Sequence, residues 1–205
     1  MIFDIVLHHT GDVFEYILDD GVHASQTGWR KNPYTINWRD QDGRGRSDWT
    51  APPTSPPPDA LVWPKELQKN DFFGRHGSGD GPGDDFESLK GIATGVQVTD
   101  QEGFQFYPVR NILIRAYKYI IGKYDVDGFR IDTLKYIEPE FAQVFGNAMR
   151  EFAESIGKKN FFTFGEVYDN EDKIAGFIGR NVTQEGDLVG VDAALDFPLF
   201  YISRL

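Results

Sequence analysis

The 205-residue sequence contains no cysteine, and its cations are outnumbered, with 21 Lys and Arg against 32 Asp and Glu. The absence of cysteine excludes a disulfide, a thiolate nucleophile and a Cys-ligated zinc site, and it leaves the redox compartment undecided. The formal net charge is −11, and the sequence contains no run of basic residues. This charge argues against a nucleic-acid partner and favours an uncharged or weakly charged ligand.

Long apolar runs are also missing. No segment reaches the roughly 20 apolar residues that span a bilayer, so we expect no membrane partner. A secretion signal is not visible at the start, and the compartment therefore stays open. The hydrophobic share of 40% is nevertheless enough for a sizeable core.

The segment 126–132, with the sequence VDGFRID, has the most informative pattern in the chain. In a strand, Phe129 and Ile131 point to one face, whereas Arg130 and Asp132 point to the other. Charged side chains are rarely buried without a partner, so an Arg and an Asp on one face of a buried strand indicate a chemical role.

Strands and helices are expected to alternate along most of the chain. The predicted strands are 1–7, 126–132, 160–167 and 194–201, and the predicted helices are 107–122, 138–157 and 170–178. This order is typical of crossover units in a parallel α/β sheet, either doubly wound or closed into a barrel. Charged residues at the carboxyl ends of successive strands favour the barrel, and no glycine-rich phosphate loop follows the first strand to favour the alternative.

Two carboxylates, Asp132 and Glu166, follow consecutive predicted strands and can therefore meet at one end of the sheet. Such a pair is the equipment of glycoside hydrolysis, with retention at a separation of about 5–5.5 Å and inversion at about 6.5–9.5 Å. Arg130 is expected to hold Asp132 anionic, and nearby Phe162 and Phe164 to raise the proton affinity of Glu166.

Asp4, in the first predicted strand, is expected to support Arg130. It can accept hydrogen bonds from Arg130, so that the guanidinium is not a lone buried charge. Simpler interpretations remain for single residues: Asp132 could cap a turn, Lys135 could be an exposed loop lysine, and most of the four tryptophans could be core.

Three motifs occur in one order: DIVLHH at 4–9, GFRID at 128–132 with Lys135, and GEV at 165–167. With them the chain resembles the alpha-amylase family of glycoside hydrolases. The resemblance implies a (β/α)8 TIM barrel, of which this chain is expected to supply about strands three to six.

The resemblance also implies that the chain consists of two parts. Residues 1–10 and 107–205 are expected to form the partial barrel, and residues 11–106 an inserted subdomain that resembles the family's B domain. The composition of the insert fits a loop-rich structure, because six of the eleven prolines fall between positions 52 and 64 and five glycines between 74 and 83.

The resemblance implies a retaining hydrolase for α-glucosidic bonds of starch and maltooligosaccharide-type substrates. Asp132 is then the nucleophile and Glu166 the general acid/base. The residues expected to bind the substrate are Arg130, His9, Lys135 and Tyr136.

The sequence departs from the family pattern in places. His8 stands where the family usually has an Asn that helps to bind a structural calcium, so we assign no metal ligand and leave calcium open. Tyr136 replaces the family's His after Lys135. The fourth motif, with a transition-state-stabilising Asp, is expected beyond Leu205, which makes the chain a fragment in this interpretation. A transglycosylase or isomerase with the same intermediate, and a non-catalytic glucan-binding relative, remain alternatives.

Overall fold

The computed structural model describes residues 1–49, 61–178 and 190–202. The chain divides into two compact units, which we describe separately. Unit 1 comprises residues 1–7 and 113–205, and unit 2 comprises residues 8–112.

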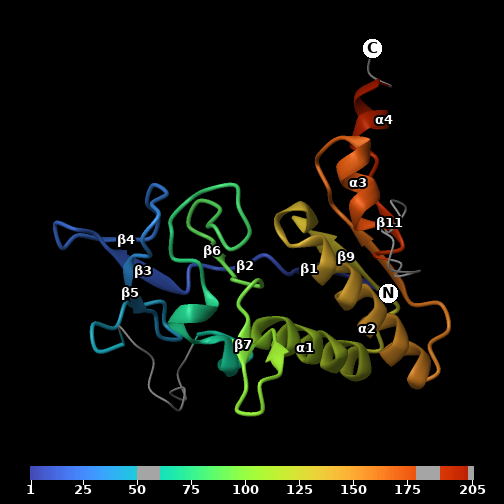
Figure 1. The fold of residues 1–205 in the computed structure, drawn as a ribbon, viewed down its shortest axis with the longest axis horizontal. Helices are drawn as coiled ribbons and strands as arrows, with labels where there is room; N and C mark the ends of the chain where they lie inside the picture. Colours follow the sequence, from blue (N-terminus) through green and yellow to red (C-terminus); the bar gives the residue numbers. More distant parts are fainter. Residues whose placement is uncertain (50–60, 179–189, 203–205) are drawn as a thin grey trace. The chain divides into compact units, whose positions relative to one another are not determined.

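Unit 1 is built on a four-stranded parallel sheet (Figure 1). Its strands are β1 (Ile2–Val6), β9 (Gly128–Asp132), β10 (Phe162–Gly165) and β11 (Ala193–Ala194). Their order in the sheet is β1-β9-β10-β11, so strands that neighbour each other in space also follow each other within the unit. The predicted alternation is confirmed in β9, where Phe129 and Ile131 are buried and Arg130 and Asp132 are partly exposed.

Three helices lie between these strands in the sequence. They are α1 (Pro108–Tyr124), whose last turns belong to unit 1, α2 (Pro139–Ser155) and α3 (Glu171–Phe177). The predictions for all three are confirmed, with a proline opening α1 and α2 as expected for a first helical turn. No helix in the described ranges is long and apolar enough to cross a membrane.

Helices α1 and α2 cover the apolar face of the sheet. The ring of Tyr117 in α1 lies 5.5 Å from that of Phe129 in β9 and 5.6 Å from that of Phe145 in α2, both edge to face. The Tyr117 hydroxyl donates to the carbonyl oxygen of Val6 at 2.8 Å. This aromatic core leaves the opposite face of the sheet, which carries Arg130, for other contacts.

The strand predicted at 194–201 is wrong. After the two-residue β11, the chain forms a helix, α4 (Phe197–Ile202). The side chain of Asp196 accepts a hydrogen bond from the backbone N–H of Leu199 at 2.9 Å, as an N-cap does. Pro198 then occupies the first turn, where its missing N–H has no consequence.

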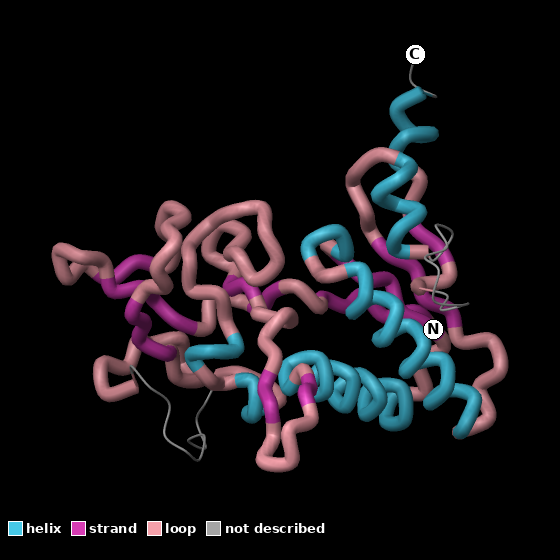
Figure 2. Tube along the Cα trace, viewed as in Figure 1, coloured by secondary structure: helices cyan, strands magenta, loops and turns pink. Residues whose placement is uncertain are grey.

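Unit 2 is rich in loops, as Figure 2 shows, and its strands are short and antiparallel. One sheet has the order β4-β3-β5, and two further pairs are β2-β6 and β7-β8. The bounds are β2 (His9–Thr10), β3 (Phe14–Ile17), β4 (His23–Ala24), β5 (Thr35–Trp38), β6 (Lys90–Gly91), β7 (Val98–Thr99) and β8 (Gln105–Phe106). Short 3-10 helices lie at Lys65–Leu67 and Asn70–Phe72.

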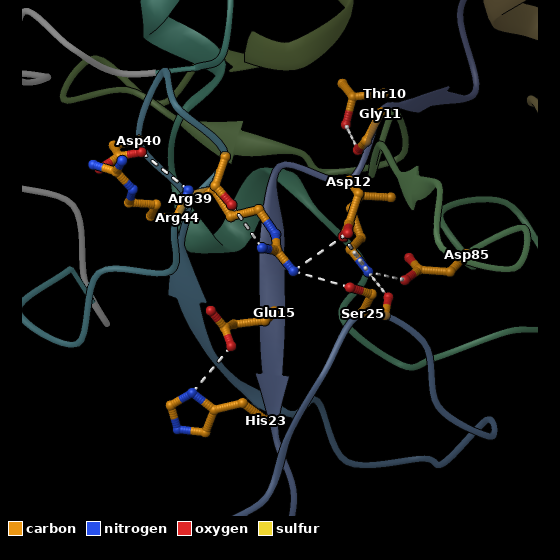
Figure 3. Close-up of polar contacts among 12 residues, drawn as sticks. Thr10, Gly11, Asp12, Glu15, His23, Ser25, Arg39, Asp40, Arg44 and Asp85 are labelled. Atoms are coloured by element: carbon orange, nitrogen blue, oxygen red, sulfur yellow. Dashed lines mark hydrogen bonds and ion pairs between the residues drawn. The ribbon is translucent and has the colours of Figure 1, made fainter.

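A buried ionic cluster lies next to the aromatic core of unit 2. The Lys90 side chain is fully buried, and its Nζ lies 3.4 Å from Asp12 and 3.7 Å from Asp85, while it donates to the carbonyl oxygen of Ser25. Arg39 also contacts Asp12, at 3.3 Å, and donates to the Ser25 hydroxyl at 2.9 Å (Figure 3). Both carboxylates therefore have a cationic partner.

Candidate active site

The register of three parallel strands brings the charged residues of unit 1 together. Asp4 in β1 is paired with Arg130 in β9, and Val6 is paired with Asp132. The backbone N–H of Glu166, directly after β10, donates to the carbonyl oxygen of Ile131 at 2.8 Å. The three acidic side chains therefore gather around Arg130 on one face, near the carboxyl ends of the strands.

Arg130 makes a hydrogen bond to each of these carboxylates. Its Nη1 donates to both oxygens of Asp4, at 2.9 and 3.0 Å. The same Nη1 donates to Oδ1 of Asp132 at 2.8 Å, and Nη2 donates to Oε2 of Glu166 at 2.5 Å. One guanidinium thus holds both candidate catalytic carboxylates, with a geometry that a lysine cannot reproduce.

These groups are partly exposed to solvent. The exposed fraction of the side chain is 25% for Arg130, 30% for Asp132 and 29% for Glu166. Burial lowers the pKa of Arg130, but the hydrogen bond to Asp4 and the three carboxylate charges outweigh it, and the pKa is raised. Arg130 therefore stays cationic.

The pKa of Glu166 is raised above the usual carboxyl value. The largest cause is a hydrogen bond between its carboxyl group and that of Asp132, followed by desolvation, and Arg130 opposes both. The direction is the predicted one, but the main cause is the second carboxylate rather than the nearby Phe162 and Phe164. Two interacting carboxyl groups do not both ionise readily, so Glu166 binds its proton more tightly than an isolated carboxyl group does.

Two glycines of the motifs are required by close packing. A Cβ at position 128 would lie 2.3 Å from the carbonyl oxygen of Phe162 on the neighbouring strand. At position 165 a Cβ would lie 2.1 Å from a methyl group of Leu134, which is fully buried. Gly128 and Gly165 thereby allow the strands and the turn after β9 to approach each other and to position the carboxylates.

Lys135 and Tyr136 lie in a 3-10 helix, Leu134–Tyr136, directly after β9. Lys135 Nζ donates to the carbonyl oxygen of Tyr168 at 3.2 Å and lies 5.0 Å from the ring centre of Tyr136 and 5.8 Å from that of Tyr168. Tyr168 is 53% exposed and is not among the site residues predicted from the sequence. Its place two residues after Glu166 is the signal that could have identified it.

His8 and His9 belong to unit 2, so their positions are described within that unit only. His9 lies in β2 and pairs with Gly91. His8 is 3% exposed, and burial first, then the charge of His9, lowers its pKa to about 4. It is therefore neutral near pH 7, and its Nδ1 lies 3.2 Å from that of His9.

Calcium requires a shell of oxygen ligands, usually with several carboxylates. A buried neutral imidazole at position 8 offers nitrogen instead. Within the described residues, no group of three or more His, Asp or Glu side chains could hold a metal ion. His8, which stands at the position of the family's calcium-binding Asn, therefore does not fit calcium as that Asn does.

No family model matches the chain. Among curated proteins, it is 37% identical over 84 residues to an alpha-amylase of Streptomyces lividans, covering 41% of this chain and 8% of that protein. It is 32% identical over 119 residues to an uncharacterized glycosyl hydrolase of Schizosaccharomyces pombe, covering 58% of this chain and 18% of that protein.

This chain matches part of an alpha-amylase-family glycoside hydrolase. The resemblance seen in the motifs is confirmed at that level. The chain spans less than a fifth of the length of the curated relatives described above.

Solved structures of alpha-amylases also match, at low similarity. The alpha-amylase of Malbranchea cinnamomea is 19% identical, with a TM-score of 0.43 and coverage of 98% of this chain and 30% of that one. The alpha-amylase of Geobacillus thermoleovorans is 25% identical, with a TM-score of 0.42 and coverage of 58% and 22%. These TM-scores are too low to carry an argument, so the similarity to alpha-amylases rests on the sequence matches.

Proposed function

We propose that this alpha-amylase-family chain carries the nucleophile and the acid/base of a retaining hydrolase for α-glucosidic bonds of starch and maltooligosaccharide-type substrates. The observation that best supports this proposal is that the single guanidinium group of Arg130 binds both Asp132 and Glu166. An inverting enzyme keeps its two carboxyl groups far enough apart to hold a water molecule. Two carboxylates that are both hydrogen-bonded to one guanidinium lie close together, and this favours the retaining mechanism.

In this proposal Asp132 attacks the anomeric carbon while Glu166 protonates the departing glycosidic oxygen. Glu166, deprotonated by that step, then removes a proton from the water that cleaves the glucosyl–Asp132 ester. The raised pKa of Glu166 suits the first step, because the acid must keep its proton near neutral pH. Arg130 orients Asp132, and Asp4 in turn supports Arg130.

The proposal includes the substrate-binding residues and the fold around them. His9, Lys135 and Tyr136 bind sugar by analogy with the family motifs, and the exposed Tyr168 beside Lys135 adds an aromatic surface. The sheet of unit 1 forms part of a TIM barrel, and unit 2 is its inserted B-like subdomain. Sequential strand order and carboxylates near the carboxyl ends of the strands support this arrangement.

A fluorinated α-glucosyl fluoride tests the nucleophile directly. Asp132 displaces fluoride, which needs no protonation, and the fluorine on the sugar slows hydrolysis of the ester. We expect a mass increase of one fluoroglucosyl group on the peptide that carries Asp132. This half-reaction is a better test than turnover, because the chain is much shorter than its relatives.

Three variants make the test specific. Asp132→Asn is expected to give no adduct, whereas Glu166→Gln is expected to keep it, because the fluoride leaving group needs no acid. Asp127→Asn, a matched change at a 58% exposed carboxylate just before β9, is expected to leave the adduct unchanged. An adduct on another residue, or one that persists in Asp132→Asn, would contradict the assignment.

A further inference from the structure

The four tryptophans of the chain differ sharply in exposure. Trp38 and Trp49 are 0% and 7% exposed and belong to the core of unit 2, whereas Trp29 and Trp63 are 55% and 60% exposed. A single exposed apolar side chain is ordinary and needs no explanation. Trp29 is unusual because its ring is held in place by several neighbours while most of its surface stays in solvent.

Three neighbours fix the indole of Trp29. The ring of His76 stacks on it, with centroids 6.2 Å apart and planes 28° apart. The indole Nε1–H donates to Oδ1 of Asp84 at 3.1 Å. A Cβ at Gly79 would lie 2.8 Å from Cδ1 of the indole and 2.4 Å from Asp84 Oδ2, so only glycine leaves room for this arrangement.

These neighbours are themselves held by hydrogen bonds. The backbone N–H of Arg30 donates to the carbonyl oxygen of His76 at 2.8 Å, and His76 Nδ1 lies 3.0 Å from the carbonyl oxygen of Arg30. The backbone N–H of Gly81 donates to Oδ2 of Asp84 at 2.9 Å. The glycine-rich segment 74–83, together with Asp84, therefore holds the Trp29 ring in place.

Asp84 retains capacity to accept further hydrogen bonds. A carboxylate has about four acceptor sites on its two oxygens, and the contacts above use one site on each oxygen. A fixed aromatic ring beside a fixed carboxylate suits a sugar, whose C–H face packs on the ring while its hydroxyls donate to the carboxylate. The negative charge of Asp84, and of the chain as a whole, disfavours an anionic ligand.

We propose that Trp29 and Asp84 form a saccharide-binding site in unit 2 that takes a neutral α-glucan chain. The choice of an α-glucan rests on the proposed function, whereas the site itself rests on the geometry around Trp29. The side chain is already ordered, so little conformational entropy is lost on binding.

Calorimetric titration of the full chain with maltoheptaose tests the site. The titrations use an Asp132→Asn background, which prevents turnover. We expect Trp29→Ala to weaken binding about tenfold, which is the effect of losing one good aromatic contact. Trp29→Phe keeps a stacking ring and is expected to bind nearly as well as the parent. Trp63→Ala is the matched control at a similarly exposed tryptophan and is expected to have no effect.

A fourth variant displaces the ring without removing it. Gly79→Ala introduces the clash described above and is expected to weaken binding as Trp29→Ala does. The emission of buried Trp38 reports in each variant that unit 2 is folded. Unchanged affinity in Trp29→Ala, an equal loss in Trp63→Ala, or no maltoheptaose binding by the parent chain would overturn the proposal.

The adduct experiment separates this inference from the proposed function. If Asp132 forms the adduct but maltoheptaose binding does not change in Trp29→Ala, the saccharide-binding site is refuted and the proposed function is not. Binding that depends on Trp29, without an adduct on Asp132, would support the saccharide site and refute the proposed hydrolase mechanism.

Discussion

Replacing Lys90 by Met isolates the role of the buried ionic cluster in unit 2. The two side chains have similar volume, so the change removes the ammonium group without leaving a large cavity. Asp12 keeps Arg39 as a partner at 3.3 Å. Asp85, whose side chain is 0% exposed, loses its nearby cation, and its remaining hydrogen-bond donors among the described residues are neutral, the Tyr16 hydroxyl and the Gly91 N–H.

The expected cost is about 3–5 kcal/mol of unfolding free energy near pH 8, as for other buried pairs that lose one partner. Burial already raises the pKa of Asp85, and the charge of Lys90 opposes that rise. Without Lys90 the pKa of Asp85 rises further. A carboxyl with a raised pKa binds its proton more tightly in the folded state, so stability is present at low pH and is lost as pH rises through that pKa.

The loss amounts to at most about 1.4 kcal/mol per pH unit for one proton. We therefore expect Lys90→Met to be only mildly destabilising near pH 5 and strongly so near pH 8. Lys90→Met combined with Asp85→Asn is expected to recover most of the stability and to lose this pH dependence, because no buried charge remains unpaired.

Urea unfolding followed by tryptophan emission measures these differences. Trp38 is a suitable reporter, because it is fully buried and its ring lies 5.4 Å from that of Phe14, which in turn lies under Lys90 Nζ. Lys31→Met, at an exposed position, is the control and is expected to change stability by less than about 0.5 kcal/mol. A loss for Lys90→Met below about 1 kcal/mol, or an equal loss at pH 5 and pH 8, would refute the reasoning.

Further predictions concern the sheet of unit 1. In Asp132→Asn the pKa of Glu166 is expected to fall toward the ordinary carboxyl value, because the Asp132 carboxyl is the main cause of its rise. A carboxyl 13C NMR titration measures this pKa. An unchanged value would contradict the interaction between the two carboxyl groups. In a protein with full turnover, kcat/KM is expected to fall as pH rises through the raised pKa of Glu166, since the acid must be protonated. Gly128→Ala is expected to cost about 1–3 kcal/mol in thermal melting, because its methyl group meets the carbonyl oxygen of Phe162, whereas Gly11→Ala, with open space around it, is the neutral control.

The sequence alone determined most of the regular elements of unit 1, from β1 to α3. Alternation of Phe129 and Ile131 with Arg130 and Asp132 identified β9 and its two faces, and prolines at the starts of α1 and α2 located those helices. These signals are local, because side-chain direction repeats every two residues in a strand and about every 3.6 in a helix. Such periodicity is visible before any tertiary contact is known.

Local signals were ambiguous near the end of the described chain. The apolar run after Asp196 fits a buried strand and a short helix about equally, since periodicity does not separate them over so few residues. The structure contains a helix, α4, because Asp196 caps the Leu199 N–H and Pro198 is tolerated in the first turn. A cap followed by an early proline is a helix signal that outweighs the apolar run.

Only the tertiary structure decided how the charges are paired and which aromatic residues are exposed. Residue spacing showed that Asp132 and Glu166 could meet, but the register of three strands decided that Arg130 binds both. Lys90 is a residue type that is usually exposed, yet it lies buried, whereas Trp29 is largely exposed. Burial and ion pairing depend on segments far apart in the chain, such as Asp12 and Asp85 around Lys90, and a local pattern contains no information about those partners.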